Sequence, residues 1–524
     1  MSDIYRPIAD PPYRGVGALL DEHRRRWPGK IALIDVERNL AISFGELAPL
    51  VDSVAKQLQH QGASKGSRVV LAGSEGVEKL LLWFGIWRLG AIVCPLDISF
   101  IGSAAAPPTM GIVDASLIVI AEHADADVIP PTAAKLLRYS SWPDSGEPAR
   151  IDTLRFIANG ADCSIALPAA STAHELASMC CTSGTTGVPK VVVYDHACYW
   201  LNGLDSIDLL NLTSDDRTLE YRSFDWYSAQ ILSLMPFLQL GSTLCVARRF
   251  SRSQFVGWIK RHRVTVSAGI PAVLNLLLEA PIDVRDDSLA SLRVMTSSTA
   301  PLSPVQWMRF EETYGIRIVN LYGSSEAGWM CGNRPSHRRI GTVGYPAPRI
   351  SFEIVDANGM ACAPEQEGQV VVGGQKLALG MRLADGSQSA IRGTTLYTRD
   401  VATRDHDGFV RVSGRTDDLI IRGGVKIVPQ EIEDVVLTYP CVNDAAALGV
   451  PDPIYGQEPV CFVVARPGVE LDADQMLTHC RARLPHEKVP KQIYIVDTLP
   501  KNARGKIVRD KLRREWWTST HRPK

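Results

Sequence analysis

Residues 181–190 read Cys-Thr-Ser-Gly-Thr-Thr-Gly-Val-Pro-Lys, and the rest of the chain is organised around this stretch. Four hydroxyl side chains and two glycines occupy the six positions 182–187. The apolar residues Leu176, Ala177 and Met179 precede them, and the apolar run 191–193 follows. The pattern predicts a strand, a flexible polar turn and a second strand.

The polar turn has a composition that suits phosphate. Glycine allows positive φ and a close approach of ligand to backbone, while Ser and Thr add hydrogen-bond donors for phosphate oxygens. The turn is not a Walker loop, because Gly-x-x-x-x-Gly-Lys-Ser/Thr is absent and no helical pattern follows directly. An ordinary polar hairpin turn has the same composition, so the residues further along the chain must decide between the two interpretations.

Composition defines a general class. A chain of 524 residues is too long for one simple core and suggests two to four structural units. With 45% hydrophobic and 22% charged residues, it is typical of a globular protein. The net charge of -1 gives no indication of nucleic acid or an anionic membrane as a partner. The 11 cysteines include no Cys-x-x-Cys pair, which argues against a disulfide framework and a structural zinc site.

The termini and apolar runs indicate a cytoplasmic protein. The N-terminal residues 1–6 are polar, and no apolar core of a secretion signal follows them. The best membrane candidate, 80–96, contains Arg88 and Pro95 and is too short to span a bilayer. We therefore expect no integral membrane segment.

Helical and strand patterns alternate in the first hundred residues. Helical spacing covers 43–60, after a Ser cap, and 77–89, and short apolar runs at 68–72 and 91–95 predict buried strands. This alternation predicts an α/β architecture with parallel strands. The pattern weakens over 102–170, where we expect surface excursions.

Further strands are predicted at 292–295 and 316–321, and each ends in a polar turn. Open α/β sheets bind ligands in the loops beyond the carboxyl ends of their parallel strands. We therefore expect the three polar turns that begin at Thr182, Thr296 and Tyr322 to converge on one crevice.

The last hundred residues have a different pattern. A helix opened by Pro429 and strands at 460–464 and 492–496 predict a compact α+β module. The charged turn at 414–418 precedes it. We predict a large N-terminal, multi-subdomain α/β domain over 1–416 and a small, mobile C-terminal α+β domain over 417–524. The sequence does not indicate an oligomeric state.

Five segments in this order support a family resemblance. They are residues 182–190, 322–326 (Tyr-Gly-Ser-Ser-Glu), 397–400 (Tyr-Thr-Arg-Asp), 414–418 (Gly-Arg-Thr-Asp-Asp) and 500–506 (Pro-Lys-Asn-Ala-Arg-Gly-Lys). Together they resemble the adenylate-forming superfamily of acyl-CoA synthetases, peptide-synthetase adenylation domains and luciferases. The resemblance extends over about 44–512, nearly the whole chain.

The resemblance implies ATP, Mg²⁺ and CoA as cofactor and co-substrates. Enzymes of this superfamily join a carboxylate to ATP, release pyrophosphate and mostly pass the acyl-adenylate to a thiol. Because carboxylate and phosphate repel each other, such a site needs backbone donors, a metal and a positioned cation.

The resemblance assigns nucleotide roles to residues of this chain. Tyr322 would lie against adenine, and Asp400 and Arg415 would contact the ribose. Lys190 would support the phosphate loop. The residues expected to hold the β- and γ-phosphates are Thr182, Ser183, Gly184, Thr185, Thr186 and Gly187.

The resemblance also implies the catalytic groups. Ser325 would contact the α-phosphate, Glu326 would bind Mg²⁺, and Lys506 would reach the carboxylate and α-phosphate in the first half-reaction. Two departures stand beside reacting positions: Arg399 where the family usually has Gly, and Val191 where Gly commonly follows the loop lysine.

Asp417 resembles the hinge about which the small domain rotates between half-reactions. Rotation would exchange Lys506 for the segment with Gly423, Gly424 and Lys426, which would face the thiol donor. The form of residues 422–433 looks more like acyl-CoA ligases than peptide-synthetase domains. A turn leading into a capped helix explains the same residues, and both interpretations can hold.

The predicted acid pocket is also inferred from the resemblance. Its residues are Asp225, Trp226, Ser298, Thr299, Ala300 and Trp329. Bulky groups favour a small or flat acid, although the aromatic residues could equally be ordinary core. Asp225, in the segment Ser-Phe-Asp, also resembles the aspartate of peptide-synthetase domains that binds the α-ammonium of amino-acid substrates. A buried carboxylate would need such a cation.

These inferences predict an AMP-forming carboxylic acid–CoA ligase that uses a small or aromatic acid. The alternative is a stand-alone enzyme that loads an amino acid or aryl acid onto a carrier protein. A non-catalytic scaffold is disfavoured because Lys506, Glu326, Asp400 and the loop hydroxyls are all present.

Overall fold

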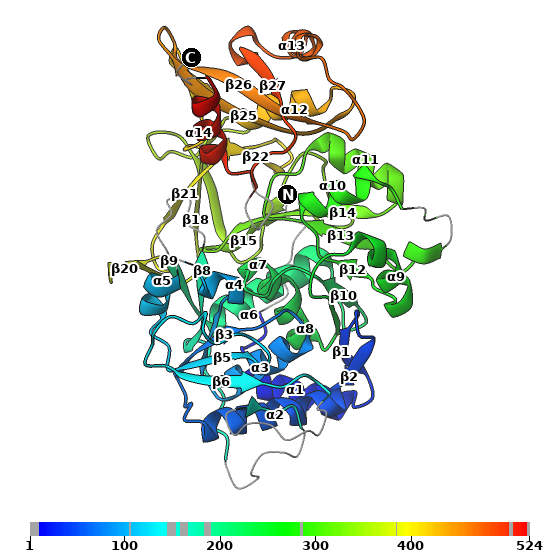
Figure 1. Ribbon diagram of the computed structural model, residues 1–524, viewed down its shortest axis with the longest axis vertical. Coiled ribbons are helices and arrows are strands. Elements are labelled where there is room, and N and C mark those ends of the chain that lie inside the picture. The colour runs from blue at the N-terminus through cyan, green and yellow to red at the C-terminus, as the bar shows by residue number, and fades with distance from the viewer. Residues whose placement is uncertain are drawn as a thin grey trace.

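The computed structural model describes residues 10–103, 106–143, 153–157, 166–182, 190–282, 284, 287–383, 385–501 and 507–520 (Figure 1). Residues 98, 99, 182 and 516–520 are described by their backbone alone. Within these ranges the strands form two nine-stranded sheets, one four-stranded sheet and one five-stranded sheet. The predicted mixture of helices and sheets is therefore confirmed.

The first nine-stranded sheet is parallel in its centre, from β1 to β14, and antiparallel at both edges. Its order is β16 (Tyr345–Pro346), β15 (Gly328–Gly332), β14 (Arg317–Ser324), β13 (Val294–Ser297), β12 (Val266–Ser267), β10 (Arg217–Glu220), β11 (Thr243–Val246), β1 (Ile31–Asp35) and β2 (Leu40–Ser43).

The second nine-stranded sheet is parallel from β8 to β7, and the hairpin partners beyond β8 are antiparallel. Its order is β20 (Gln388–Ala390), β19 (Gly380–Leu383), β9 (Lys190–Asp195), β8 (Leu176–Thr182), β4 (Ile92–Pro95), β3 (Arg68–Ala72), β5 (Leu117–Ala121), β6 (Lys135–Tyr139) and β7 (Thr153–Leu154).

Helices surround and connect these sheets. We call the chain up to Arg415 the large part of the molecule. Its helices are α1 (Val16–Arg26), α2 (Phe44–His60), α3 (Val77–Arg88), α4 (Ile98–Ile101), α5 (Ala106–Val113), α6 (His196–Leu210), α7 (Tyr227–Ala229), α8 (Met235–Leu240), α9 (Arg252–His262), α10 (Pro271–Glu279) and α11 (Pro304–Tyr314). A π-helical turn, Gln230–Leu234, joins α7 to α8. Short 3₁₀ turns lie at Asp287–Leu289 and His486–Lys488.

Helix α2 begins where the sequence predicts. Glu46 N donates to Ser43 Oγ at 3.3 Å, and Ser43 N donates to Glu46 Oε2 at 2.8 Å. This capping box satisfies backbone donors that a helix start leaves without partners. Together with α3, whose apolar face is buried, α2 confirms the predicted alternation of strands and helices.

The expectation of surface excursions over 102–170 is wrong for part of that region. Strand β5 reads Leu-Ile-Val-Ile-Ala, is buried throughout and lies between β3 and β6 inside the sheet. A short apolar run of this kind has no alternation that would distinguish a strand buried on both faces. The prolines on either side, at 107–108 and 130–131, are typical of loops and led to the wrong expectation.

The polar turns also differ from their predicted limits. Strand β13 includes Thr296 and Ser297, so its turn begins at Ser298. Strand β14 continues through Tyr322 to Ser324 and forms an antiparallel hairpin with β15. Pairing with neighbouring strands therefore overrides the local turn signal of Ser, Thr and Gly.

The remaining two sheets follow in chain order. The four-stranded antiparallel sheet has the order β17 (Ser351–Val355), β18 (Gly368–Gly373), β21 (Leu396–Arg404) and β22 (Val410–Arg415). The five-stranded sheet contains β24 (Val425–Ile427), β23 (Ile420–Arg422), β26 (Gly456–Ala465), β25 (Val442–Asp452) and β27 (Gln492–Ile495).

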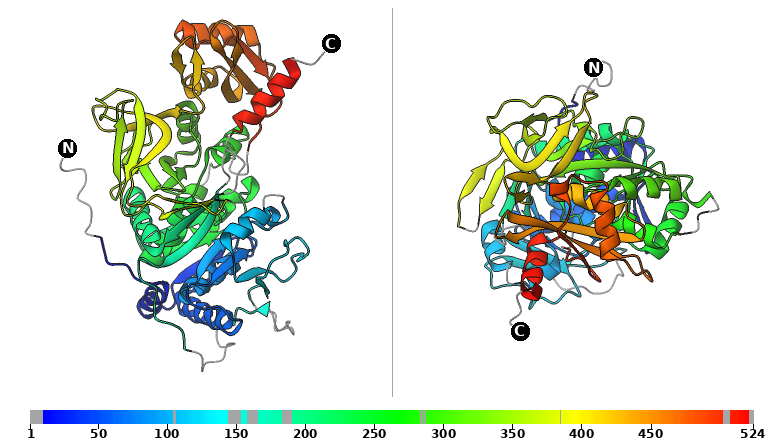
Figure 2. Two further views of the ribbon diagram at one scale, coloured as in Figure 1. Left: turned by 90° about the vertical axis from the view of Figure 1, so that its left-hand side faces the viewer. Right: turned by 90° about the horizontal axis from the view of Figure 1, so that it is seen from above.

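The five-stranded sheet forms a separate unit, which we call the small part. It has its own core, to which helices α12 (Pro429–Leu437) and α13 (Ala473–Arg481) contribute. Helix α14 (Arg509–Thr520) packs beside β25. Figure 2 shows this part, in orange and red, at one end of the molecule, whereas the first helices, in blue, lie at the other. The chain passes from one sheet to the other between Arg415 and Ile420.

Candidate active site

Three residues predicted to bind nucleotide meet at one place. Asp400 on β21 is directly opposite Arg415 on β22, and Arg415 Nε lies 3.8 Å from Asp400 Oδ1. Tyr322, from the far end of β14, donates its hydroxyl to Asp400 Oδ2 at 2.5 Å. Burial and the charge of Asp400 raise the pKa of Tyr322 well above its usual value, so this phenol stays protonated. The cluster joins two sheets and presents a carboxylate suited to sugar hydroxyls.

The turn between β14 and β15 is held by its backbone. Tyr194 on β9 donates its hydroxyl to Ser325 O at 2.7 Å, and Ala378 N donates to Glu326 O at 2.9 Å. The side chains of Ser325 and Glu326 are half-buried. The turn is therefore anchored to strand β9 of the second sheet, the strand that follows the predicted phosphate loop.

Tyr194 is a residue of this region that the sequence motifs do not indicate. Its ring stacks on that of Tyr227 with centroids 4.1 Å apart, and Tyr227 directly follows Trp226 of the predicted acid pocket. Tyr194 thus connects the Ser325 turn to the acid-pocket loop. A tyrosine within an apolar strand carries no signal of such a role, because the contact depends on pairing of distant segments.

The hairpin of β14 and β15 requires two glycines. A Cβ at Gly323 would lie 2.3 Å from Gly328 O. Gly328 has φ +65°, and a Cβ there would lie 1.9 Å from Asn202 Oδ1. A side chain at Gly323 would separate the two strands of the hairpin, and one at Gly328 would push the hairpin away from α6, so either would displace the Ser325 turn.

The carboxylate of Glu326, in the turn between β14 and β15, fits a metal site in which phosphate supplies the other ligands. Among the described residues, no group of three or more His, Cys, Asp or Glu side chains could hold a metal ion. Magnesium is usually bound by one or two carboxylates together with substrate phosphates. A single carboxylate such as Glu326 fits that type of site.

Several predicted residues fall outside the described part of the chain. They are Ser183, Gly184, Thr185, Thr186, Gly187 and Lys506. The backbone positions flanking the predicted phosphate-binding segment are described: Thr182 ends β8 and pairs with Lys190, which begins β9. Both strands of the predicted strand–turn–strand are therefore confirmed.

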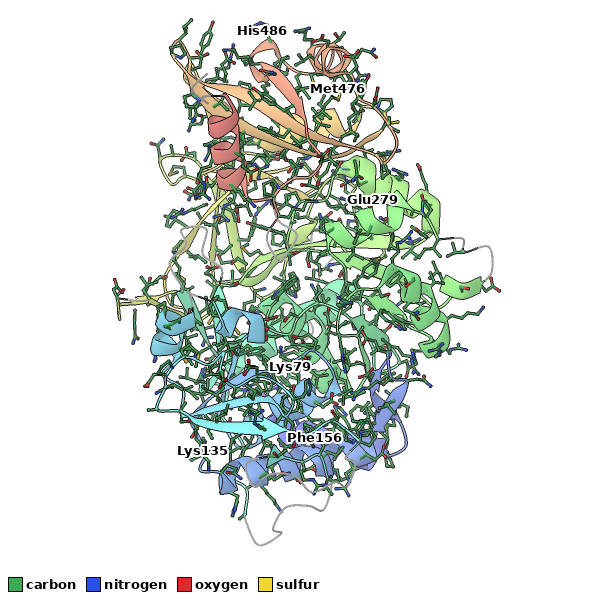
Figure 3. The ribbon with its side chains drawn as sticks, viewed as in Figure 1. Lys79, Lys135, Phe156, Glu279, Met476 and His486 are labelled. Carbon is green, nitrogen blue, oxygen red and sulfur yellow. The ribbon has the colours of Figure 1, made fainter. Side chains whose placement is uncertain are left out.

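A buried ion cluster lies beside the predicted acid pocket. Lys79 on α3 is fully buried, and its Nζ donates to Asp225 Oδ1 at 2.6 Å and to Glu75 Oε1 at 2.5 Å. Glu75 also accepts from Ser223 Oγ at 2.8 Å and from Phe224 N at 3.1 Å. Figure 3 shows Lys79 in the interior of the large part. The cation that a buried Asp225 needs is therefore supplied by the chain itself.

A second ion pair, buried between Arg222 and Glu220, supports the Ser298 side of the predicted acid pocket. Arg222 binds Glu220 through two nitrogens, Nε to Oε1 at 2.9 Å and Nη2 to Oε2 at 2.7 Å. Arg222 Nη1 donates to Ser298 Oγ at 3.2 Å. This guanidinium thus holds the turn after β13 against the loop after β10, and Ser298 and Trp226 belong to connected loops.

The remaining predicted pocket residues differ in exposure. Thr299 has φ +74° and is exposed, and a positive φ is unusual for a β-branched residue. Ala300 is half-buried. Trp329 is 2% exposed and its Nε1 donates to Ser206 Oγ at 2.8 Å, which places its indole against α6 in the core.

A cavity of about 610 Å³ opens next to this region. Its lining includes Glu75, Arg222 and Trp226, together with the exposed arginines Arg248 and Arg249. Acidic and basic groups therefore share its wall, and the two exposed guanidinium groups are suited to phosphate.

The predicted thiol-facing residues lie in the small part. Gly423 and Gly424 have φ of +54° and +87° and form the turn between β23 and β24. Gly423 N donates to Tyr455 O at 2.8 Å. Lys426 on β24 is exposed. Both glycines therefore serve a tight turn, and the backbone there remains accessible.

The two departures from the family pattern occupy ordinary strand positions. Val191 is fully buried on β9 and pairs with Cys181. Arg399 lies on β21, and its Nη1 donates to Asp417 Oδ2 at 2.6 Å. Neither Val191 nor Arg399 has a positive φ, and the Arg399 side chain contacts the predicted hinge.

Comparison with known proteins establishes the family. The model of the AMP-binding enzyme family matches residues 20–381, and that of the AMP-binding enzyme C-terminal domain matches residues 431–506. The chain belongs to the AMP-binding enzymes, as the resemblance predicted.

Curated relatives extend over almost the whole chain. Sulfoacetate–CoA ligase of Cupriavidus necator is 29% identical, with 95% of this chain and 97% of the relative covered. Indoleacetate–CoA ligase of Aromatoleum aromaticum is 29% identical, with 94% and 96% covered.

A solved structure of an anthranilate CoA ligase in complex with anthranoyl-AMP has the same fold. Its TM-score is 0.83 at 23% identity, with 96% of this chain and 98% of that chain covered. The predicted fold, a large N-terminal α/β domain followed by a C-terminal domain, is confirmed.

Proposed function

We propose that the protein is an AMP-forming carboxylic acid–CoA ligase. It joins an acid to ATP, releases pyrophosphate and transfers the acyl group from the adenylate to CoA. The observation that carries this conclusion is the cluster of Tyr322, Asp400 and Arg415 in a chain of the AMP-binding family. Relatives that match over 94–95% of the chain are CoA ligases.

The nucleotide is positioned by residues from two sheets. The Asp400 carboxylate accepts hydrogen bonds from the ribose hydroxyls, and Arg415 lies beside the same sugar. Tyr322 lies against adenine, and its hydroxyl holds Asp400 in place. Residues 182–187 hold the β- and γ-phosphates through backbone and hydroxyl donors, and Lys190 supports this segment.

The acid attacks the α-phosphate, and pyrophosphate leaves. Ser325 contacts the α-phosphate, and Lys506 brings positive charge to the two reacting anions. Glu326 would hold Mg²⁺, which neutralises phosphate charge when bound. The backbone bonds from Tyr194 and Ala378 keep the Ser325 turn in position.

The acid is small or aromatic. The pocket is formed by Trp226, Ser298, Thr299 and Ala300, with Trp329 behind them in the core. Asp225 is already paired with Lys79, which removes the need for an ammonium group on the substrate. The Asp225–Lys79 contact therefore favours an acid without an amine.

CoA is the acceptor. The glycine turn at Gly423 and Gly424 allows a pantetheine arm to approach the backbone once the small domain, from Asp417 onward, has rotated. Arg248 and Arg249 at the cavity beside Trp226 offer guanidinium groups to the phosphates of CoA. A carrier protein is the competing acceptor.

The compartment we propose is the cytoplasm. Every cysteine in the described part of the chain is a free thiol, which suits a reducing environment. No described helix has the length and apolar character needed to cross a bilayer.

The decisive experiment is acid-dependent exchange of pyrophosphate into ATP, measured over a panel of small and aromatic acids with and without amine groups. Exchange with at least one acid is expected. Absence of exchange with every acid would favour a non-catalytic scaffold. Product analysis with CoA and with a phosphopantetheinylated carrier protein then identifies the acceptor.

A variant tests whether the pocket recognises an amine. We expect Asp225→Ala to keep its preference among acids with and without amine groups, because Asp225 already binds Lys79. Selective loss of activity toward amine-bearing acids would instead assign Asp225 to an ammonium group and support the carrier-loading alternative.

A further inference from the structure

The crossing between the two domains contains two adjacent carboxylates. The chain leaves β22 at Arg415 and enters β23 at Ile420. Asp417 and Asp418 lie between these strands, and each is bound by an arginine from a different side of the crossing.

Asp417 is held by the large part of the molecule. Arg399 Nη1 donates to Asp417 Oδ2 at 2.6 Å, and Thr416 N donates to Arg399 O at 2.8 Å. Arg399 lies on β21, which is fixed between β18 and β22. The Arg399 and Asp417 side chains are 56% and 47% exposed, so salt reaches the pair.

Asp418 is held by the small part. Arg509 Nη1 lies 3.7 Å from Asp418 Oδ2, at the start of α14. Arg509 also binds the buried Glu433 of α12, and its Nε donates to Ala447 O at 3.2 Å on β25. Three elements of the small part, α12, β25 and α14, therefore hold this guanidinium beside Asp418.

The other polar contacts across the boundary are few among the described residues. Asn443 Nδ2 donates to Glu279 Oε1 at 2.8 Å, and Gln306 Nε2 lies 3.5 Å from Asn443 O. Figure 3 shows Glu279 below the small part. One backbone bond, Asp418 N to Arg415 O at 3.0 Å, spans the crossing itself. Rotation at this point would break little tertiary structure.

We propose that Arg399 and Arg509 are positioning residues that clamp Asp417 to the large domain and Asp418 to the small domain. The rotation between half-reactions is thereby confined to the backbone between these two aspartates. The proposal rests on the proposed function, because it assumes the two half-reactions of the ligase. The clamp on Asp417 gives a role to the side chain of Arg399, which stands where the family usually has glycine.

The exposed clamp has a limited and salt-dependent strength. An exposed ion pair shifts an equilibrium by up to about fivefold. Screening reduces it further, because the Debye length falls from about 8 Å at physiological ionic strength to about 3 Å at 1 M salt. Loss of Arg399 should therefore broaden the set of domain orientations without unfolding the protein.

The test measures domain orientation without turnover. Fluorophores are introduced through unnatural amino acids at the exposed residues Met308 and Ile454, one in each domain. Single-molecule energy transfer is compared for the wild type, Arg399→Met, Asp417→Asn and the double variant. Arg68→Met is the matched control, because Arg68 is also a strand residue paired with an aspartate.

The clamp predicts a broader distance distribution in both single variants and no further change in the double variant. High salt should reproduce this in the wild type. The ratio of the thioester rate to the adenylation rate should change by about twofold to fivefold in Arg399→Met. Unchanged distributions, additive effects, or the same change in Arg68→Met would overturn the proposal.

The second clamp needs a variant that keeps the buried pair. Arg509→Met would leave Glu433 buried without its cation, so Asp418→Asn is used, which leaves Glu433 paired. It should also broaden the distribution, and an unchanged distribution would overturn the role of Arg509. The distance distributions need no substrate, so failure of pyrophosphate exchange would refute only the proposed function and leave this test of the clamp intact.

Discussion

Asp400 is the residue through which the two sheets of the proposed nucleotide site meet. Its carboxylate accepts from Tyr322 and faces Arg415, so its removal affects both neighbours. Hydrogen bonds to charged groups contribute about 1.5–3 kcal/mol. We therefore expect Asp400→Ala to raise the KM for ATP about 10- to 100-fold. Steady-state kinetics at saturating acid would measure this. Asp405→Ala, just beyond the end of the same strand, serves as control, and an unchanged KM would remove Asp400 from the ribose site.

Lys79 makes the opposite kind of contribution, to stability rather than binding. Lys79→Met would leave the carboxylates of Glu75 and Asp225, which are 12% and 14% exposed, without a cation, at a cost of at most about 3–5 kcal/mol. Burial raises the pKa of Glu75 above its usual value, so folding favours its protonated form and the loss should shrink at acidic pH. Urea unfolding at pH 7 and pH 5 would measure this.

The neutral triple variant is the comparator for Lys79→Met. It combines that change with Glu75→Gln and Asp225→Asn, and it should recover most of the lost stability because no charge is buried. A single variant as stable as the wild type would show that water reaches this cluster.

At the scale of elements, the start of α6 contains a pH-sensitive residue. His196 is buried against Tyr13 and Trp87, and its Nε2 has no hydrogen-bond partner among the described residues. Burial lowers the pKa of His196 from 6.5 to about 4, against the opposing charges of Asp195 and Glu175. The folded state therefore binds fewer protons than the unfolded state.

Stability should then fall as pH drops below about 6.5. The His196 contribution at pH 5 is a loss of about 2 kcal/mol relative to pH 7. His196→Phe keeps an aromatic ring in the same packing and should remove this part of the pH dependence. Urea midpoints at the two pH values compare the variant with the wild type, and equal shifts in both proteins would contradict the prediction.

At the scale of the whole molecule, Lys506 tests domain alternation. We expect Lys506→Ala to reduce pyrophosphate exchange by a factor of about 100 or more, because it removes positive charge from two reacting anions. Thioester formation from a supplied acyl-adenylate should be spared, because the proposed rotation of the small domain would have moved Lys506 away. Lys511→Ala, an exposed position on α14, is the control. Equal loss of both steps would count against alternation.

The sequence was sufficient to predict much of the architecture. The capping box at Ser43 and Glu46, the apolar strands and the Pro429 helix start depend on neighbours in the chain, so local pattern predicts them. The five ordered motifs identified the family for the same reason, since each is a short continuous segment.

The stretch 181–190 by itself predicted the two strands β8 and β9 that flank it, and the family motifs predict that the residues between them bind phosphate. Only the tertiary structure decided which residues meet: Tyr322 with Asp400, Tyr194 with Ser325, Lys79 with Asp225, and Arg399 with Asp417. The physical reason is that each of these contacts joins residues on different elements, and their proximity depends on sheet order and packing rather than on the spacing of residues along the chain.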